Sequence, residues 1–239
     1  MATAKTDEKI LSTFLDLLSR HSYEEVSLPL IAEEAGVKLS DLRARFGSRL
    51  DLIEAFVAQI DRLVLDDADP EMSDQPARER LFDVLMTRLD HLTPHKQALR
   101  TLEKAALCDP GLLLHLNRMA VNSQNWMLAA AGIQIPGVKG KLVTQGLAIS
   151  FARVVRVWLD EADEGMPRTM SRLDKELDAG EDWLGRLDKA QKMSKPFFRL
   201  AGKVACRISG RRSRRRSGSD YGADVTPEPG GEDLAPASA

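Results

Sequence analysis

Apolar residues recur along most of the chain at intervals of three and four positions, which is the spacing of one face of an α-helix. Residues 7–22 show this first, with Ile10, Phe14 and Leu18 on one side. Leu and Ala dominate the apolar positions, and both residues favour helices. No stretch has the sustained alternation of apolar and polar positions that is typical of a half-buried strand. The pattern therefore predicts an all-α fold.

Capping and helix-breaking residues divide the N-terminal part of the chain into short helices. Ser27 is a good N-cap, and Pro29 suits the first turn of a helix because its missing N–H would be unpaired there anyway. Gly36 stands where a helix ends with a residue in the left-handed conformation. A third short helix is predicted over residues 39–46, and Ser48 then begins a capping-box-like sequence that opens a long fourth helix.

The helical pattern continues beyond a linker predicted at residues 66–75. The helices expected there are residues 78–92, 96–107, 112–131, 139–159 and 166–187. The last part of the chain has a different composition, because a basic segment without acidic residues is followed by one rich in Gly, Pro, Ser and Asp that is typical of disorder. The expected organisation is an N-terminal three-helix domain (1–66), a helical bundle (76–188), a basic segment (189–216) and a disordered tail (217–239).

The two short helices on either side of Gly36 have the features of a helix-turn-helix. Such helices cross at a wide angle, so the second can enter the major groove of DNA. Five apolar residues would hold the pair together, namely Ile31, Ala35, Val37, Leu42 and Phe46. The polar residues of the second helix would face outward, and the free N–H groups that open the fourth helix would favour a phosphate. The candidate DNA-binding residues are Ser27, Lys38, Ser40, Asp41, Arg43, Arg45 and Arg49.

Residues 27–49 resemble the TetR family of transcriptional regulators. The landmarks are a Ser cap, Ile31-Ala32, Ala35-Gly36-Val37, a short helix ending in Phe46, and Ser48-Arg49. The resemblance implies a TetR-like fold, in which the helical bundle binds an effector and forms a homodimer. It also implies a repressor of double-stranded DNA whose two recognition helices enter major grooves about 34 Å apart. A small apolar ligand would release the DNA by binding one arrangement of the dimer more tightly.

Charge weakens the expectation of DNA binding. An exposed basic helix face is more often only solvated, and here it is the matched motif that favours a contact. Acidic residues outnumber basic ones in residues 1–65, although phosphate neutralisation supplies much of the affinity for DNA. Arg43 stands where the family commonly has Tyr, although Arg can also hold a phosphate. Asp41 can accept a hydrogen bond from cytosine, but phosphates repel it.

A second resemblance leaves another function open. Residues 80–90, 157–161 and 168–174 are similar to a lipid-binding accessory family of ubiquinone biosynthesis that has the TetR fold but does not read DNA. Residues 195–208 would form a basic amphipathic C-terminal helix, which can lie in an anionic membrane surface. The candidate contact residues are Phe197, Phe198, Arg199, Lys203 and Arg207. The basic residues there can instead bind nucleic acid, or the helix can pack on the core with its charges solvated.

Candidate ligand-pocket residues are Trp126, Met127 and Trp158, although such residues at helical spacing more often belong to the core. No catalytic or metal-binding pattern is present, because Pro94 separates the two nearest histidines and no third ligand lies nearby. We expect a protein that is not an enzyme and needs no cofactor.

The two cysteines are far apart, which is typical of free thiols in a reducing compartment. The sequence begins without the apolar stretch of a signal peptide. No run approaches the roughly twenty apolar residues of a transmembrane helix. These features predict a soluble, cytoplasmic protein.

Overall fold

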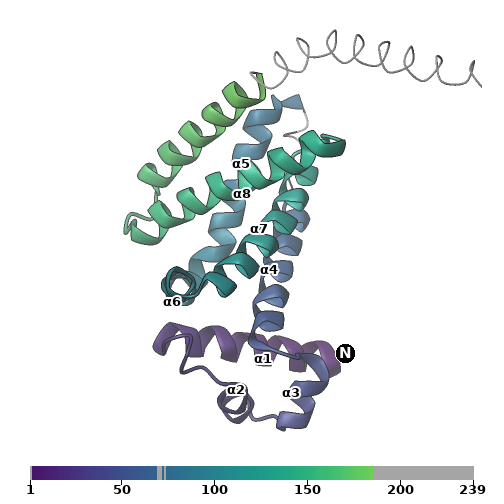
Figure 1. The fold of residues 1–239 in the computed structure, drawn as a ribbon, viewed down its shortest axis with the longest axis vertical. Helices are drawn as coiled ribbons and strands as arrows, with labels where there is room; N and C mark the ends of the chain where they lie inside the picture. Colours follow the sequence, from purple (N-terminus) through teal and green to yellow (C-terminus); the bar gives the residue numbers. More distant parts are fainter. Residues whose placement is uncertain (1, 69–71, 73, 186–239) are drawn as a thin grey trace, which may run out of the picture. The chain divides into compact units, whose positions relative to one another are not determined.

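The computed structural model describes residues 2–68, 72 and 74–185, and within these residues it is helical with no strand. The helices are α1 (Ala2–Arg20), α2 (Leu28–Glu34), α3 (Leu39–Arg45), α4 (Arg49–Asp66), α5 (Ala77–Leu92), the 3-10 turn η2 (Thr93–His95), α6 (Lys96–Cys108), α7 (Pro110–Ala130) and α8 (Gly137–Asp160), and residues 167–185 are also helical (Figure 1). The predicted all-α fold is confirmed. The predicted basic segment and tail, residues 189–239, lie outside the described residues.

Helix ends differ from the sequence prediction where the ends lack apolar residues. The first helix begins at Ala2 instead of residue 7, because its first turn carries no apolar stripe for the pattern to detect. The seventh helix begins at Pro110, two residues earlier than predicted. Asp109 caps it by accepting hydrogen bonds from the N–H groups of Gly111 (2.8 Å) and Leu112 (3.1 Å).

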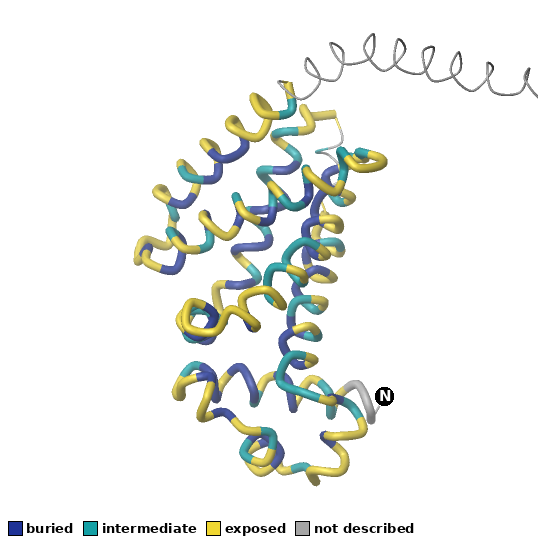
Figure 2. The backbone as a smooth tube through the Cα atoms, viewed as in Figure 1, coloured by how far each residue is buried: buried dark blue, intermediate teal, exposed yellow. Residues whose placement is uncertain are grey.

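Helix α4 belongs to both halves of the described structure. Its first half packs against α1, and its second half runs beside α5 and α7 (Figure 1). Apolar residues are buried along its whole length, including Leu52, Phe56, Ile60 and Val64. We call α1, α2, α3 and the first half of α4 the N-terminal unit, and the helices that follow the bundle. Helix α1 also packs on α6, so α1 and α4 both connect the N-terminal unit to the bundle. Buried positions accordingly continue from α1 through α4 into the bundle without a break (Figure 2).

A charged cluster is buried where α4, α5 and α7 meet. Asp61 on α4 forms an ion pair with Arg88 on α5 and accepts a hydrogen bond from the Ser123 hydroxyl on α7 at 2.6 Å. All three residues are at most 7% exposed. The Arg88 guanidinium also lies 5.9 Å from the centroid of the Phe151 ring on α8. Four helices of the bundle are thus held by one buried side-chain network.

Helix α8 is the one helix in the described part of the chain with the length and apolar composition of a membrane span. Core helices pass the same test. This helix packs along α7 and buries Ala148, Val154 and Trp158 in the bundle. The structure therefore uses α8 as a bundle helix.

Glu161 joins the end of α8 to the next helix. Its carboxylate accepts hydrogen bonds from the N–H groups of Arg168 (2.7 Å) and Thr169 (2.8 Å) and from the Thr169 hydroxyl. Burial alone would raise the pKa of this carboxyl, but the hydrogen bonds from Thr169 and Arg168 together hold it below its usual range. Its main-chain oxygen accepts a further hydrogen bond from Lys96 on α6 at 2.5 Å.

We expect Asp61→Ala to lower the free energy of unfolding by about 3–5 kcal/mol, because it leaves the Arg88 charge buried and unpaired. The double variant Asp61→Leu/Arg88→Met should be considerably more stable than the single one, since apolar pairs often replace buried ion pairs without loss. Urea titrations followed by circular dichroism measure both. A double variant as unstable as the sum of its single changes would show that the two residues are not coupled.

Glu161→Gln should lower the free energy of unfolding at pH 7 by about 1 kcal/mol, the usual value of a helix cap. The carboxyl has a lower pKa when folded than when unfolded, so its contribution is present above the unfolded value of about 4.3. It is lost as the pH falls through the folded value. The difference in thermal midpoint between variant and parent should therefore be smaller at pH 3.5 than at pH 7, and Glu164→Gln, at an exposed position, is the control.

Candidate nucleic-acid interface

The turn between α2 and α3 is set by short-range signals in the sequence. The Ser27 hydroxyl accepts from the N–H of Leu30 at 3.4 Å at the start of α2. Gly36 has a φ of +61°, a conformation that residues with a side chain rarely adopt, and this ends the helix. The N–H of Val37 then bonds to the carbonyl of Ala32 at 2.9 Å. The chain is thereby turned so that α3 begins at Leu39.

The inner faces of α2 and α3 are buried against each other and against α1. Ile31, Ala35 and Leu42 are 0% exposed, and Phe46 is 8% exposed. Val37 is half-buried and packs on the same core. The five apolar residues expected to hold the pair together are therefore in place.

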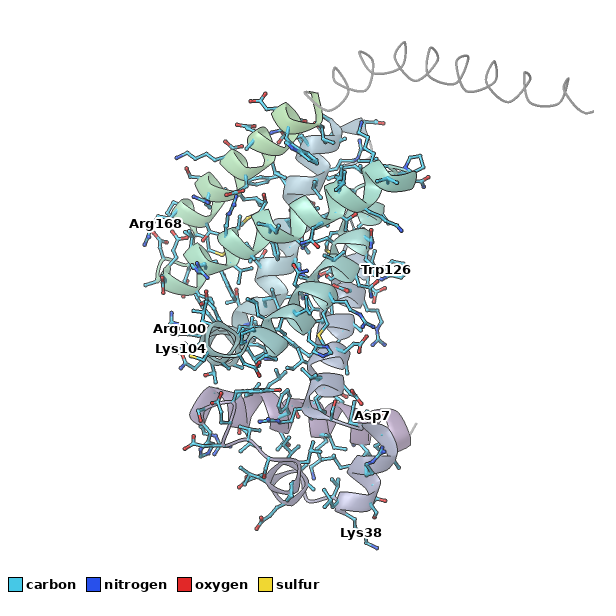
Figure 3. All side chains as sticks on the ribbon, viewed as in Figure 1. Asp7, Lys38, Arg100, Lys104, Trp126 and Arg168 are labelled. Carbon is cyan, nitrogen blue, oxygen red and sulfur yellow. The ribbon has the colours of Figure 1, made fainter. Side chains whose placement is uncertain are left out.

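The outer face of α3 is polar and exposed. Lys38, Ser40, Asp41 and Arg43 are all exposed to solvent. Lys38 points away from the other helices at the outer end of the N-terminal unit (Figure 3). Four of the seven predicted DNA-binding residues are thus brought together on one accessible surface, which we call the α3 face.

Arg45 lies at the edge of this surface and turns toward α1. Its guanidinium forms an ion pair with Asp7, and its side chain is 24% exposed. Asp7 lies on α1 beside the C-terminal end of α3 (Figure 3). The ion pair connects α3 to α1. It also neutralises the positive charge of Arg45, one of the predicted DNA contacts.

Arg49 is held inside the N-terminal unit. Its guanidinium donates hydrogen bonds to the main-chain oxygens of Tyr23 and, at 3.1 Å, Val26. It also lies 4.1 Å from the centroid of the Tyr23 ring. Burial raises the pKa of the Tyr23 hydroxyl, although Arg49 acts in the opposite direction. Arg49 therefore fastens the loop that leads into Ser27, and the residues around Arg49 contain no signal that predicts this arrangement.

The start of α4 carries its own anion. Ser48 caps the helix by accepting from the N–H of Asp51 at 3.3 Å, and the Asp51 carboxylate accepts from Ser48 (2.7 Å) and from the N–H of Gly47 (2.7 Å). These hydrogen bonds, from Ser48 first and then Gly47, lower the pKa of Asp51, and nearby Arg43 adds to the effect. The predicted capping box is confirmed, and its carboxylate occupies the helix end that the sequence suggested for a phosphate.

The predicted pocket residues differ in their surroundings. Met127 and Trp158 are 0% and 1% exposed in the bundle core, whereas Trp126 is 52% exposed and points outward from α7 (Figure 3). None of them lines any of the three cavities described in this structure. Phe197, Phe198, Arg199, Lys203 and Arg207 lie outside the described residues.

The histidines that stand four apart have separate surroundings. His91 bonds to Asp67 at 2.8 Å, and His95 lies edge-on to Phe56 with ring centroids 5.0 Å apart. Burial lowers the pKa of His95. The described ranges contain no group of three or more potential metal ligands.

Comparison with models of known protein families finds no match, and neither does comparison with curated proteins. Solved structures do match the chain. A TetR transcriptional regulator from Nitrosomonas europaea is 22% identical with a TM-score of 0.60, over 73% of this chain and 97% of that one. A TetR transcriptional regulator from Rhodococcus sp. RHA1 is 19% identical with a TM-score of 0.55, over 74% and 96%. A TetR-family regulator from Streptomyces coelicolor is 20% identical with a TM-score of 0.50, over 84% and 99%. The chain therefore has the fold of the TetR family of transcriptional regulators.

Proposed function

We propose that this protein is a DNA-binding transcriptional regulator that acts as a repressor and a homodimer. The observation that carries the proposal is the α3 face, where exposed polar side chains stand on a helix whose inner side is fully buried. A helix held in this way can enter a major groove while its inner side stays packed on the rest of the N-terminal unit. Figure 3 shows Lys38 extending from this surface.

The residues of the interface have different roles in this proposal. Lys38, Ser40 and Asp41 face the base edges, where the Asp41 carboxylate can accept from the amino group of a cytosine. Arg43 contacts a backbone phosphate, and Ser27 lies at the start of α2, where another phosphate can approach. Arg45 and Arg49 act instead as positioning residues, because Asp7 and the loop carbonyls already hold their guanidinium groups.

An exposed apolar stripe on α8 supports the homodimer. Val138, Leu142 and Ile149 recur at helical spacing and are 74%, 49% and 45% exposed. Apolar side chains this exposed on one face of a helix are typical of a surface covered by a partner. A second copy that meets this stripe about a two-fold axis would present two α3 faces to successive major grooves, about 34 Å apart.

The connections between the two halves support control by a ligand. Helix α4 runs through both, and α6 touches α1 as well as the end of α8, where Arg100 bonds to the carbonyl of Leu159. A small apolar ligand that favours one arrangement of the bundle helices would alter the spacing of the two α3 faces and release DNA.

The alternative role in ubiquinone biosynthesis is not favoured by the comparisons, since the matched structures named above are transcriptional regulators. A gel-shift titration with the DNA that flanks the protein's own gene, run beside liposome flotation of the same sample, separates the two functions. Saturable retardation that resists competitor DNA supports the regulator. Flotation with lipid and no retardation would support the accessory protein instead.

Arg43→Gln should weaken binding to all DNA sequences alike and reduce the salt dependence of binding by about one unit for each protomer. The matched change Arg49→Gln should lower the thermal midpoint, because it releases the loop from Tyr23 to Val26. Fluorescence anisotropy over a range of salt concentrations and differential scanning fluorimetry measure the two effects. An unchanged salt slope in the Arg43 variant would remove that residue from the DNA contacts.

Ile149→Glu should convert the dimer to a monomer, because it places a charge within the apolar stripe on α8. Leu114→Glu is the control, since Leu114 is 70% exposed on α7 and lies outside the stripe. Sedimentation equilibrium gives the mass of each variant. A dimer that persists in the Ile149 variant would place the interface on another surface.

A further inference from the structure

A cavity of about 540 Å³ lies between the second half of α7 and the start of α8. This is within the usual range for small-molecule sites, about 300–1,000 Å³. Helices α7 and α8 lie side by side (Figure 1), and the loop that joins them contributes Ile133 and Ile135 to the cavity wall. Its wall is formed by Val121, Asn125, Leu128, Ile133, Ile135, Gly137, Gly140, Lys141, Thr144 and Gln145.

The loop wall of this cavity is fixed by its backbone. Gly132 and Gly137 have φ values of +67° and +73°, so both turns of the loop depend on glycine. The N–H of Ile133 bonds to the carbonyl of Leu128 at 2.8 Å. A side chain at Gly140 would place its Cβ 1.9 Å from the oxygen of Ile135, which shows how closely the loop lies on α8. The backbone of the loop therefore sets the shape of this wall.

The polar side chains of the cavity are mostly occupied with one another. The Thr144 hydroxyl is 3.0 Å from the Asn125 side-chain oxygen and 2.9 Å from the Gly140 carbonyl. The amide groups of Gln145 and Asn117 are paired at 3.0 Å. These pairs satisfy the polar side chains, so the branched aliphatic side chains of the lining provide the surface that remains for a ligand to cover.

Lys141 gives the cavity its charge. It is the single charged residue in the wall, it is exposed, and it forms no ion pair with any residue that the structure describes. The two other cavities carry an acid in their walls, Glu24 in one and Asp83 in the other. An unpaired ammonium group beside an aliphatic surface favours a molecule with one anionic group and an apolar body.

We infer that this cavity binds a small amphiphilic carboxylate, with its carboxylate at Lys141 and its apolar body against Val121, Leu128 and Ile133. As an effector site it rests on the proposed regulatory function, and it names the chemical class of that effector. The bound molecule would bridge α7 and the first turns of α8, the helix that carries the proposed dimer stripe.

The test uses octanoate, octanol and octylamine as probes in isothermal titration calorimetry of the full chain, below their micellar concentrations. Octanoate should bind most tightly and octylamine least. Affinity should rise by roughly 10-fold from hexanoate to octanoate, as each buried methylene contributes to binding. Equal binding of all three probes would overturn the inference.

Two variants locate the site. Val121→Phe fills the apolar wall and should abolish binding of octanoate and octanol. Lys141→Gln should weaken octanoate binding by roughly 2- to 5-fold at low salt and leave octanol unchanged. Lys104→Gln, in the wall of another cavity, and Leu114→Ser, on an exposed part of α7, are the matched controls and should bind as the parent does. Full octanoate binding by the Val121 variant, with its circular dichroism unchanged, would overturn the inference.

Gel shifts of the parent protein with and without octanoate keep the two proposals distinct. DNA binding without any octanoate binding overturns the cavity assignment and leaves the regulator standing. Octanoate binding that obeys the variants, in a protein that binds no DNA, supports the site while the regulatory function fails.

Discussion

The carboxylate of Asp61 fixes the second half of α4, the helix that runs through both halves of the described structure, to the other helices of the bundle. It lies on α4, the helix whose first half forms part of the N-terminal unit, and it binds both Arg88 on α5 and Ser123 on α7. A buried charge is costly unless its partners are well placed, so these helices cannot move apart independently of α4. A rearrangement of these helices would therefore either break the contacts of Asp61 with Arg88 and Ser123 or move the three side chains together.

Not every buried polar atom in this part of the bundle has a partner. The Nε atom of Arg88 and the side-chain oxygen of Gln124 are buried without a hydrogen-bond partner in the described part of the chain. Each such group costs about 1–3 kcal/mol relative to a bonded one. An apolar core would avoid this cost, so the cluster does not simply maximise stability. A bundle with two arrangements separated by a small free-energy difference is what ligand control requires.

The parts of the fold that the sequence predicted are those that depend on neighbours in the chain. The caps at Ser27 and Ser48, the left-handed Gly36 and the buried face of α3 all follow from residues a few positions apart. Arg49 shows where this reasoning ends. Its partners are main-chain carbonyls of a loop more than twenty positions earlier. The residues next to Arg49 are the same whether its guanidinium binds this loop or is free to bind a phosphate, so they cannot predict which occurs. The ion pair of Asp61 with Arg88 was missed for the same reason.

Those internal partners change the electrostatics of the proposed DNA surface. Arg45 and Arg49 are engaged within the N-terminal unit, Asp51 places a carboxylate at the start of α4, and Lys38 and Arg43 remain as the exposed cations of the α3 face. If the protein binds DNA as proposed, the α3 face can neutralise few phosphates, so the electrostatic attraction from this surface would be weak and would fall little with added salt. Binding through this surface would then rely on base contacts and on two protomers acting together, which would make the proposed dimer part of the recognition. A ligand that changed the spacing of two weak contacts would need only a modest preference between arrangements to release the DNA.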